Sequence, residues 1–413
     1  MGWRPALPPG PYLVVGLARS GQAALRVLGD EARGVDRKRG DDTPVALEGI
    51  RCVVKSPGVP PGAPVIAAAR ERRIPVIGEL ELAWRLLPNE FIAVTGTNGK
   101  TTTVGLLGAI HREAGLAAAV AGNVGAPLSG LVGELSADAV VVCEASSFQL
   151  EDTIEFAPEA AVLLNAAPDH LDRHGSFDAY LAAKLQVFAR QGNDDVAVAP
   201  VGLGVEDLGG CARRVCFGAG GELDDRAGHL WWDGEPLIAH DEIRLRGAHN
   251  RANAAAAAAI ALARGVDPGA VRAALSAFEG VEHRLEEVAT IEGVLYVNDS
   301  KATNVDSTLV ALDAFEEPIH LILGGGGKGQ DFTPLREPVR ERCAGVYLIG
   351  TDGPAIGTAI GAGVDCGDLA TAVGRARAAA QAGEIVLLSP ACESYDQFDD
   401  FEHRGRAFKE LVR

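Results

Sequence analysis

The chain has 413 residues, of which 47% are hydrophobic and 23% are charged, a composition that fits two or three globular domains of roughly 150 residues each. A formal net charge of −18 argues against nonspecific binding to nucleic acid or to anionic membranes. The seven cysteines show neither zinc-ligand spacing nor a disulfide pattern, and no apolar run reaches about 18 residues, so we expect a cytoplasmic protein without a membrane span.

The first part of the chain is expected to form a small nucleotide-binding domain. Tyr12–Val15 is predicted to be a strand, Gly16–Gly21 a glycine turn before a helix, and Cys52–Val54 a later strand. Asp36 follows Gly16 at about the distance, roughly 20 residues, that is typical of an acid binding the ribose of NAD. A dehydrogenase is therefore an open alternative, although the dinucleotide motif lacks its second glycine here.

The most informative stretch is Phe91–Val104. A short apolar run ends in Gly96-Thr97-Asn98-Gly99-Lys100-Thr101-Thr102, and a helical pattern follows. Glycines let a backbone curl so that its N–H groups point into one concavity, and the N-terminus of the next helix adds partial positive charge. Lys100 can then reach the outer phosphates of a nucleotide, and the Thr101 hydroxyl can bind Mg²⁺. The stretch predicts ATP or GTP binding, although Val94 stands where the general phosphate-loop pattern has its first glycine.

Two polar residues follow predicted buried strands farther along the chain. Glu144 comes directly after Ala139–Cys143, and His170 lies shortly after the apolar run Ala160–Leu164. The carboxyl ends of strands in an open parallel sheet face the crevice where ligands bind, and a carboxylate there can hold Mg²⁺. The alternative is that Glu144 caps a helix and that His170 lies at the surface.

Lys184 is expected on an apolar helical face. Phe177, Leu181 and Phe188 recur at helical spacing, and Lys184 shares their face. A buried ammonium group is costly unless it is paired. Either the side chain extends to solvent along its apolar stem, or it has a role in a site.

A further α/β series is expected after Gly280. Its predicted strands are Val294–Val297, His320–Leu323, Val346–Ile349 and Ile385–Leu388. Polar stretches follow three of these strands, namely Asn298–Asn304, Gly324–Asp331 and Ser389–Phe398. Together their hydroxyl, amide and ammonium groups could hold a small dicarboxylate, whereas each one taken separately is also compatible with an ordinary turn.

These features together closely resemble the Mur ligase family, in the same order and over nearly the whole chain. The matching motifs are Thr95–Thr101, Gly122–Gly125, Glu144–Gln149, Asp169–Asp172, Lys184, His249–Asn253, His283-Arg284, Asn298–Asn304, the loop at Lys328 and Ser389–Phe401. Two of them, Asn298–Asn304 and Ser389–Phe398, are narrower and look like those of the family members that add D-glutamate.

The resemblance implies an α/β fold with three domains. These are an N-terminal Rossmann-like domain that binds a UDP-sugar (1–88), a central parallel-sheet domain similar to P-loop ATPases (89–280), and a C-terminal Rossmann-like domain that binds the amino acid (281–413). It further implies ATP-dependent ligation of D-glutamate to UDP-N-acetylmuramoyl-L-alanine through an acyl phosphate, in peptidoglycan precursor synthesis. ATP and one or two Mg²⁺ ions are the implied cofactors, and we expect a monomer that closes when its substrates bind.

The same resemblance implies roles for individual residues. Lys100, His170 and Lys184 match catalytic positions, and Lys184 is expected to be carbamylated by CO₂, which converts its ammonium group to an anion. The expected magnesium ligands are Thr101, Glu144, His170 and the Lys184 carbamate. The expected ATP contacts are Gly96, Thr97, Asn98, Gly99, Lys100, Thr101, Thr102, Asn253, Arg284 and Asp299. The expected D-glutamate contacts are Lys301, Thr303, Lys328, Ser394 and Phe401, and those of the UDP-sugar are Arg19, Ser20, Arg37, Ser56, Asn123 and Gln149.

Three alternatives stay open beside this hypothesis. The chain could be another amide ligase of the same group, for instance one that adds glutamate to folate. It could be a nucleotide-binding regulator without catalytic activity. The dehydrogenase is the third, and it leaves the loop around Lys100 unexplained.

Overall fold

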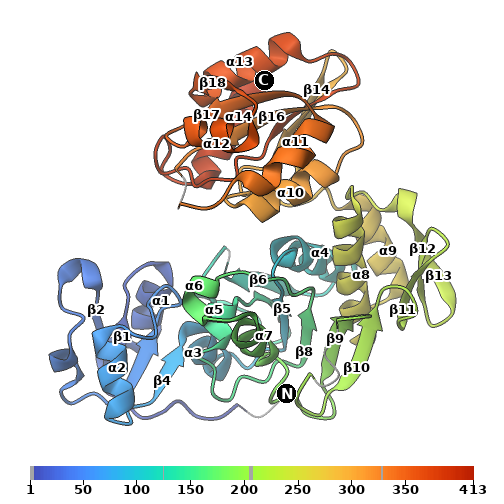
Figure 1. Cartoon of the computed structure of the whole chain (residues 1–413). Coiled ribbons are helices and arrows are strands. Elements are labelled where there is room, and N and C mark those ends of the chain that lie inside the picture. The colour runs from blue at the N-terminus through green and yellow to red at the C-terminus, as the bar shows by residue number, and fades with distance from the viewer. Residues whose placement is uncertain (1–3, 124, 204–207, 327–328) are drawn as a thin grey trace. The chain divides into compact units, whose positions relative to one another are not determined.

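The computed structural model describes residues 4–123, 125–203, 208–326 and 329–413. The chain divides into two compact units, of which the first contains Met1–Ile243 and Ala252–Phe278 and the second contains Arg244–Arg251 and Glu279–Arg413. Three sheets, each wholly or mainly parallel and accompanied by helices, make up the described structure (Figure 1). The predicted α/β class is therefore confirmed.

The first sheet has four parallel strands in the order β2–β1–β3–β4. Its strands are β1 (Tyr12–Val15), β2 (Ala32–Val35), β3 (Cys52–Lys55) and β4 (Val76–Gly78), and its helices are α1 (Arg19–Leu28), α2 (Pro64–Glu71) and α3 (Glu79–Leu86). The predicted strands and the helix after the glycine turn are confirmed. The loops that follow β1, β2 and β3 all lie at the carboxyl edge of this sheet, because its strands run in one direction.

The second sheet has nine strands in the order β13–β12–β11–β10–β9–β8–β5–β7–β6. Its strands are β5 (Phe91–Thr95), β6 (Ala118–Gly122), β7 (Val140–Glu144), β8 (Ala160–Leu163), β9 (Val196–Pro200), β10 (Arg213–Phe217), β11 (Leu223–Arg226), β12 (His229–Trp232) and β13 (Glu235–Ala239). Its helices are α4 (Lys100–Glu113), α5 (Ser147–Leu150), α6 (Leu171–His174), α7 (Phe177–Leu185), α8 (Ala248–Ala263) and α9 (Pro268–Ala277). The strands from β6 to β11 pair in parallel, and β12 and β13 extend the sheet in antiparallel fashion.

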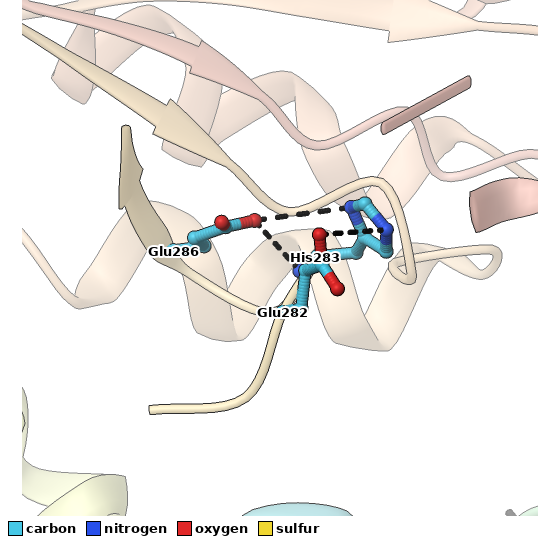
Figure 2. A group of neighbouring side chains, drawn as sticks. All are labelled: Glu282, His283 and Glu286. Atoms are coloured by element: carbon cyan, nitrogen blue, oxygen red, sulfur yellow. Dashed lines mark hydrogen bonds and ion pairs between the residues drawn. The ribbon is translucent and has the colours of Figure 1, made fainter. Parts of the chain in front are cut away.

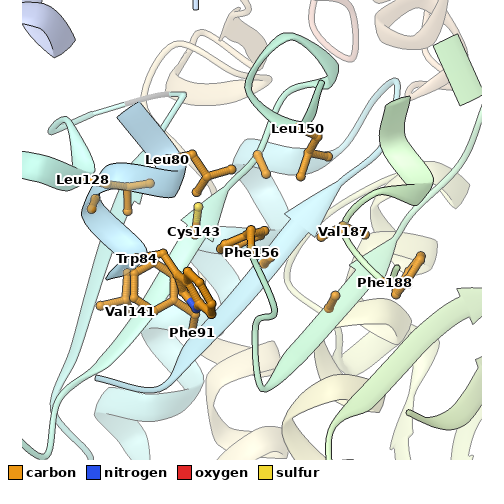
Figure 3. Close-up of a cluster of buried hydrophobic side chains, with 14 of the residues drawn as sticks. Leu80, Trp84, Phe91, Leu128, Val141, Cys143, Leu150, Phe156, Val187 and Phe188 are labelled. Atoms are coloured by element: carbon orange, nitrogen blue, oxygen red, sulfur yellow. The ribbon is translucent and has the colours of Figure 1, made fainter. Parts of the chain in front are cut away.

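Helix α3 contributes to the cores of both sheets. On one face, Leu80 and Trp84 join the cluster drawn in Figure 3, in which the Trp84 and Phe156 rings meet edge to face with centroids 5.8 Å apart. On another face, Leu82 packs in the core of the first sheet. A fully buried large apolar side chain stabilises a fold by about 1.5–3 kcal/mol, so this shared packing helps to hold both sheets in one unit. The domain boundary expected after residue 88 lies just beyond α3, and it stays a prediction.

The third sheet has six strands in the order β14–β15–β19–β16–β17–β18, with only β14 antiparallel to its neighbour. Its strands are β14 (Glu286–Ile291), β15 (Val294–Asn298), β16 (Ile319–Gly324), β17 (Cys343–Ile349), β18 (Val364–Gly367) and β19 (Ile385–Leu388). Its helices are α10 (Val305–Asp313), α11 (Arg336–Arg342), α12 (Gly353–Ile360), α13 (Leu369–Ala379) and α14 (Phe401–Val412). All four strands predicted after residue 280 are confirmed.

The described helices are short. The longest of them, α8, has 16 residues, which corresponds to a rise of about 24 Å. None of the helices in the described ranges is both long and apolar enough to cross a membrane.

Candidate active site

The predicted phosphate loop joins β5 to α4. Gly96 has a φ of +153° and Gly99 a φ of +87°, so the backbone turns sharply twice before the helix begins at Lys100. The positive φ of Gly99 favours glycine, and a β-carbon there would lie 2.1 Å from the side-chain oxygen of Asn253 in α8. The side chain of Asn253, an expected ATP contact, thus lies against the backbone of the loop at Gly99.

Polar groups of the loop meet oxygen atoms of the protein. The Lys100 ammonium donates to the carbonyl oxygens of Gly96 at 2.9 Å and Thr97 at 2.8 Å. The backbone amides of Thr97 and Asn98 donate to the side-chain oxygen of Asn165 at 3.1 and 2.9 Å. Phosphate oxygens offer acceptors of the same kind, so this loop has the donors that a nucleotide phosphate needs.

Glu144 is the last residue of β7, and its side chain is buried. The Thr101 hydroxyl donates to one of its carboxylate oxygens at 2.9 Å, and the Asn123 amide donates to the other at 3.0 Å. A β-carbon on Gly122 would lie 2.3 Å from the carbonyl oxygen of Glu144, so glycine lets β6 end this close to β7. The structure therefore brings together two of the expected magnesium ligands, and a carboxylate with a hydroxyl is a hard oxygen donor set that fits Mg²⁺.

His170 lies at the start of α6 with left-handed backbone angles, φ 50° and ψ 34°. Its side chain is about half exposed, at 49%, and its Nε2 lies 3.5 Å from a carboxylate oxygen of Asp169. Its ring centroid is 4.8 Å from that of Phe148 in α5. These contacts do not test the expected placement of His170 beside Thr101 and Glu144, which stays a prediction.

Lys184 is buried in α7, with only 1% of the residue exposed. Its ammonium donates to the Gly96 carbonyl oxygen at 2.8 Å and lies 4.4 Å from the centroid of the Tyr180 ring. The alternative in which this side chain extends to solvent is therefore wrong. Burial, reinforced by the nearby charge of Lys100, lowers the pKa of Lys184 to about 7, so a large fraction of the amine is neutral and nucleophilic near neutral pH.

Two further ATP contacts were expected at Arg284 and Asp299, in the second unit. Asp299 is buried; it accepts a hydrogen bond from the Ser389 hydroxyl at 2.8 Å and one from the Leu285 amide at 3.1 Å. Burial raises the pKa of Asp299 to about 7, and hydrogen bonding to Ser389 and the charge of Arg284 oppose that rise. Asp299 thus joins two of the polar stretches that follow strands of the third sheet.

Of the residues expected to bind D-glutamate, Lys301, Thr303 and Ser394 lie in these same stretches, and Phe401 begins α14 just beyond. The Lys301 ammonium is 5.9 Å from the centroid of the Phe401 ring, and the Ser300 hydroxyl donates to the Phe401 carbonyl oxygen at 2.8 Å. Ser394 is buried and Thr303 is partly exposed. Lys328 lies outside the described residues.

Arg404 organises these stretches and was not found from the sequence. It lies in α14 and is 1% exposed. Its guanidinium donates to the carbonyl oxygens of Ser300 at 2.9 Å, Cys392 at 3.0 Å and Glu393 at 3.2 Å. Burial lowers the pKa of Arg404 to about 10, which still leaves it charged at neutral pH. One signal existed: Arg404 precedes Phe408 by four residues on the buried face of a helix.

Four of the six expected UDP-sugar contacts lie near the glycine turn of the first sheet. The Ser56 hydroxyl donates to the Gly16 carbonyl oxygen at 2.7 Å and lies 3.4 Å from the hydroxyl of Ser20. Asp36 accepts from the Leu17 amide at 2.7 Å, and this bond lowers its pKa. Asp36 therefore holds the turn in this structure.

Two other expected contacts near this turn, Arg19 and Arg37, are both exposed. Gln149 instead lies in α5, beside the second sheet, where its side-chain oxygen accepts from the Ser146 amide at 3.0 Å and caps the helix.

A second group of possible metal ligands lies outside the expected site. Glu282, His283 and Glu286 bring their ligand atoms within 4.8 Å of one another (Figure 2). The Lys409 ammonium, however, lies 2.9 Å from a carboxylate oxygen of Glu282 and 2.5 Å from one of Glu286. The Asn298 amide lies 2.9 Å from Nδ1 of His283. Lys409 and Asn298 thus supply the positive charge and the hydrogen bonds that a metal ion would otherwise provide, so we interpret this cluster as a structural network.

Comparison with known proteins finds relatives along the whole chain. Residues 94–204 match the family description Mur ligase middle domain, and residues 283–392 match Mur ligase, glutamate ligase domain. The UDP-N-acetylmuramoylalanine–D-glutamate ligase of Anaeromyxobacter dehalogenans is 44% identical, and that of Pelotomaculum thermopropionicum is 41% identical; each match covers 97% of this chain and 96% of the relative. Among solved structures, the UDP-N-acetylmuramate–alanine ligase of Thermotoga maritima has a TM-score of 0.64 at 21% identity, covering 97% of this chain and 98% of its own, a likeness of fold.

Proposed function

This chain belongs to the Mur ligase family, and we infer that it uses ATP to join D-glutamate to UDP-N-acetylmuramoyl-L-alanine. The observation that supports the chemistry best is the convergence of Lys100, Lys184 and the Thr101–Glu144 pair around one glycine loop. We infer the two substrates from the names of relatives that share more than 40% identity with this chain over nearly their whole length. The reaction is a step of peptidoglycan precursor synthesis, and we place it in the cytoplasm.

The chemistry has two stages. A free carboxylate is a poor electrophile because its charge repels an incoming amine. Transfer of the γ-phosphoryl group of ATP to the alanine carboxylate releases ADP and gives an acyl phosphate with a good leaving group. The D-glutamate ammonium loses a proton, and the resulting amine attacks the carbonyl carbon. Collapse of the tetrahedral adduct breaks the C–O bond to phosphate, and a second proton passes from the nitrogen to the released phosphate, which leaves an amide.

The residues of the phosphate loop would align and neutralise the phosphates. Lys100 would exchange its carbonyl partners for β- and γ-phosphate oxygens, and the helix N-terminus would contribute its partial positive charge. Thr101, Glu144 and His170 would hold Mg²⁺, as one or two ions. The metal supplies charge neutralisation on the phosphate oxygens.

Lys184 would act as a carbamate. Its neutral amine attacks CO₂, which forms an N–C bond, and the nitrogen then loses a proton. The side chain, a cation when protonated, thereby becomes an anion. The lowered pKa of Lys184 favours this step because only the neutral amine is a nucleophile. The resulting anion would bind or orient the magnesium site beside Lys100.

The remaining expected contacts are proposed for the substrates. Asn253, Arg284 and Asp299, with loop residues Gly96 to Thr102, would bind ATP. Lys301 and Lys328 would pair with carboxylates of D-glutamate, beside Thr303, Ser394 and Phe401. Arg19, Ser20, Arg37, Ser56, Asn123 and Gln149 would bind the UDP-sugar. We also propose that the chain works as a monomer of three domains, 1–88, 89–280 and 281–413.

The test is phosphate release by the purified chain with ATP, Mg²⁺ and UDP-N-acetylmuramoyl-L-alanine, run against a panel of amino acids. We expect release only with D-glutamate, together with a UDP-sugar product lengthened by one residue. Release with another amino acid, or with folate and glutamate, would assign a different ligase of the group. Absence of release with every pair would favour a regulator, and binding of NAD detected by nicotinamide absorbance would favour the dehydrogenase.

A further inference from the structure

Arg173 lies in α6, three residues after His170, and its guanidinium group contacts three residues from two separate parts of the first unit, the α5 segment and the loop after β3. Its carbon Cζ lies 4.0 Å from the centroid of the Phe148 ring. One terminal nitrogen donates to the carbonyl oxygen of Pro57 at 3.2 Å, and the other pairs with the carboxylate of Glu151. The side chain is 14% exposed, so these contacts are largely shielded from water.

Phe148 connects this guanidinium to His170. The Phe148 ring lies 4.8 Å from the ring of His170 and stacks on that of His174 at 5.5 Å. His174 is itself held by the Ser147 hydroxyl, 3.1 Å from its Nε2. The half-exposed His170 side chain therefore has one firmly held neighbour, and Arg173 is among the groups that hold it.

Pro57 connects the same guanidinium to the first sheet. It follows Ser56 in the loop after β3, and Ser56 is an expected UDP-sugar contact whose hydroxyl bonds to the glycine turn. Arg173 thus reaches from the helix that His170 precedes to the loop that would bind the UDP-sugar. Lysine could pair with Glu151 but lacks the planar fork needed to stack on Phe148 and bond Pro57 at the same time.

We propose that Arg173 is a positioning residue for the ligation: it fixes Phe148 against His170 and anchors that segment to the UDP-sugar loop. The inference rests on the proposed function, because the role of His170 is part of it. Loss of Arg173 would misplace His170, and small misplacements of reacting groups can cost up to about 100-fold in rate.

The test is a double-mutant cycle between Arg173→Met and His170→Ala, measured as kcat with saturating substrates. We expect Arg173→Met to lower kcat by about 10- to 100-fold in the wild-type background. In the His170→Ala background the same substitution should cost no more than about 3-fold, because residues that act through each other are not additive. Equal losses in both backgrounds, or an unchanged kcat in the single variant, would overturn the proposal.

Arg70→Met is the matched control. Arg70 also faces a carboxylate that follows α5, that of Asp152 at 3.8 Å, but its side chain is 50% exposed. We expect Arg70→Met to leave kcat within about 2-fold and to be additive with His170→Ala. If Arg173→Met does not fold, as judged by its thermal transition, Arg173→Lys replaces it in the same cycle. We expect the kcat of Arg173→Lys to be well below that of wild type.

A second readout needs no turnover. Calorimetric titration of the metal-free chain with UDP-N-acetylmuramoyl-L-alanine should show binding weakened about 3- to 10-fold by Arg173→Met, since the bond to the Pro57 carbonyl is lost. His170→Ala and Arg70→Met should leave this Kd unchanged. An unchanged Kd in Arg173→Met would remove the link to the UDP-sugar loop. If wild type itself neither ligates nor binds this substrate, the proposed function fails before Arg173 is tested.

Discussion

The first unit buries two lysines in different surroundings. Lys55 is the last residue of β3, and its side chain is fully buried with its ammonium 2.7 Å from a carboxylate oxygen of Asp152, which follows α5. It also donates to the Val59 carbonyl oxygen at 2.9 Å. Lys184 is buried beside the phosphate loop, and its ammonium meets the neutral carbonyl oxygen of Gly96 and the face of Tyr180.

The difference lies in what opposes the cost of burial. Burial lowers the pKa of both lysines, but at Lys55 the charge of Asp152 works against that shift. At Lys184 the neighbouring charge of Lys100 adds to it and outweighs the opposing charge of Asp169, so the pKa falls to about 7. A buried lysine with a carboxylate partner is thus a structural ion pair, whereas one with neutral partners is ready for chemistry on its amine.

The largest expected effect follows from breaking the structural pair. Lys55→Met should lower the free energy of unfolding by about 3–5 kcal/mol, because it leaves the Asp152 carboxylate buried without its cation. Urea denaturation monitored by circular dichroism would measure it. The double variant Lys55→Met/Asp152→Leu should recover most of the loss; a double variant as unstable as the single one would contradict the assignment.

Lys184→Ala should change activity instead. We expect ligation to fall by about 10²–10³-fold or more, as for loss of one electrostatic group in an active site, equivalent to about 2.7–4 kcal/mol in the barrier. Phosphate release would measure it, and added formate or acetate should restore part of the activity by replacing the carbamate. Unchanged turnover would discredit the carbamate, and a stability loss as large as that of Lys55→Met would contradict the contrast between the two sites.

The sequence predicted those parts of the site that depend on local signals. Glycines before Lys100 predicted the loop, and an apolar run before Glu144 predicted a strand that ends in a carboxylate. Lys184 was placed on a buried helical face by periodicity, but whether it is paired depends on Gly96, which is distant in the chain. The same applies to Asn165, which holds the loop amides, and to Arg404, whose carbonyl partners come from two other loops.

One missed element did have a local signal. The antiparallel extension β11–β12–β13 has tight turns at Ala227-Gly228 and Asp233-Gly234, where all four residues have positive φ. Aspartate followed by glycine between two short strands is a strong hairpin signal, so this extension could have been predicted. The β-strands themselves are rich in charged and aromatic residues, and their pattern alone is weak.

A smaller effect is expected in the pH dependence of the unfolding free energy, to which the lowered pKa of Lys184 contributes. Between about pH 7 and its ordinary pKa near 10.5, Lys184 is neutral in the folded chain and protonated in the unfolded one. Unfolding then takes up a proton, so Lys184 makes stability rise with pH by at most about 1.4 kcal/mol per unit; below pH 7 both states are protonated and the slope vanishes.

Lys184→Met removes this term. Denaturation of both proteins in CO₂-free buffers from pH 6 to 9 should show wild type gaining on the variant only above about pH 7. A difference that stays constant across this range would mean that Lys184 keeps an ordinary pKa.

The smallest expected effect tests whether burial decides how much a cation paired with Asp152 contributes to the free energy of unfolding. Arg70 faces the same Asp152 as Lys55, but at 3.8 Å and with half of its side chain exposed. Arg70→Met should therefore cost less than about 1 kcal/mol of unfolding free energy, and the loss should shrink further at high salt, which screens exposed charges. A loss approaching that of Lys55→Met would show that Asp152 is held by both cations together. In that case the buried contact at 2.7 Å would no longer account on its own for the contrast drawn between Lys55 and Lys184.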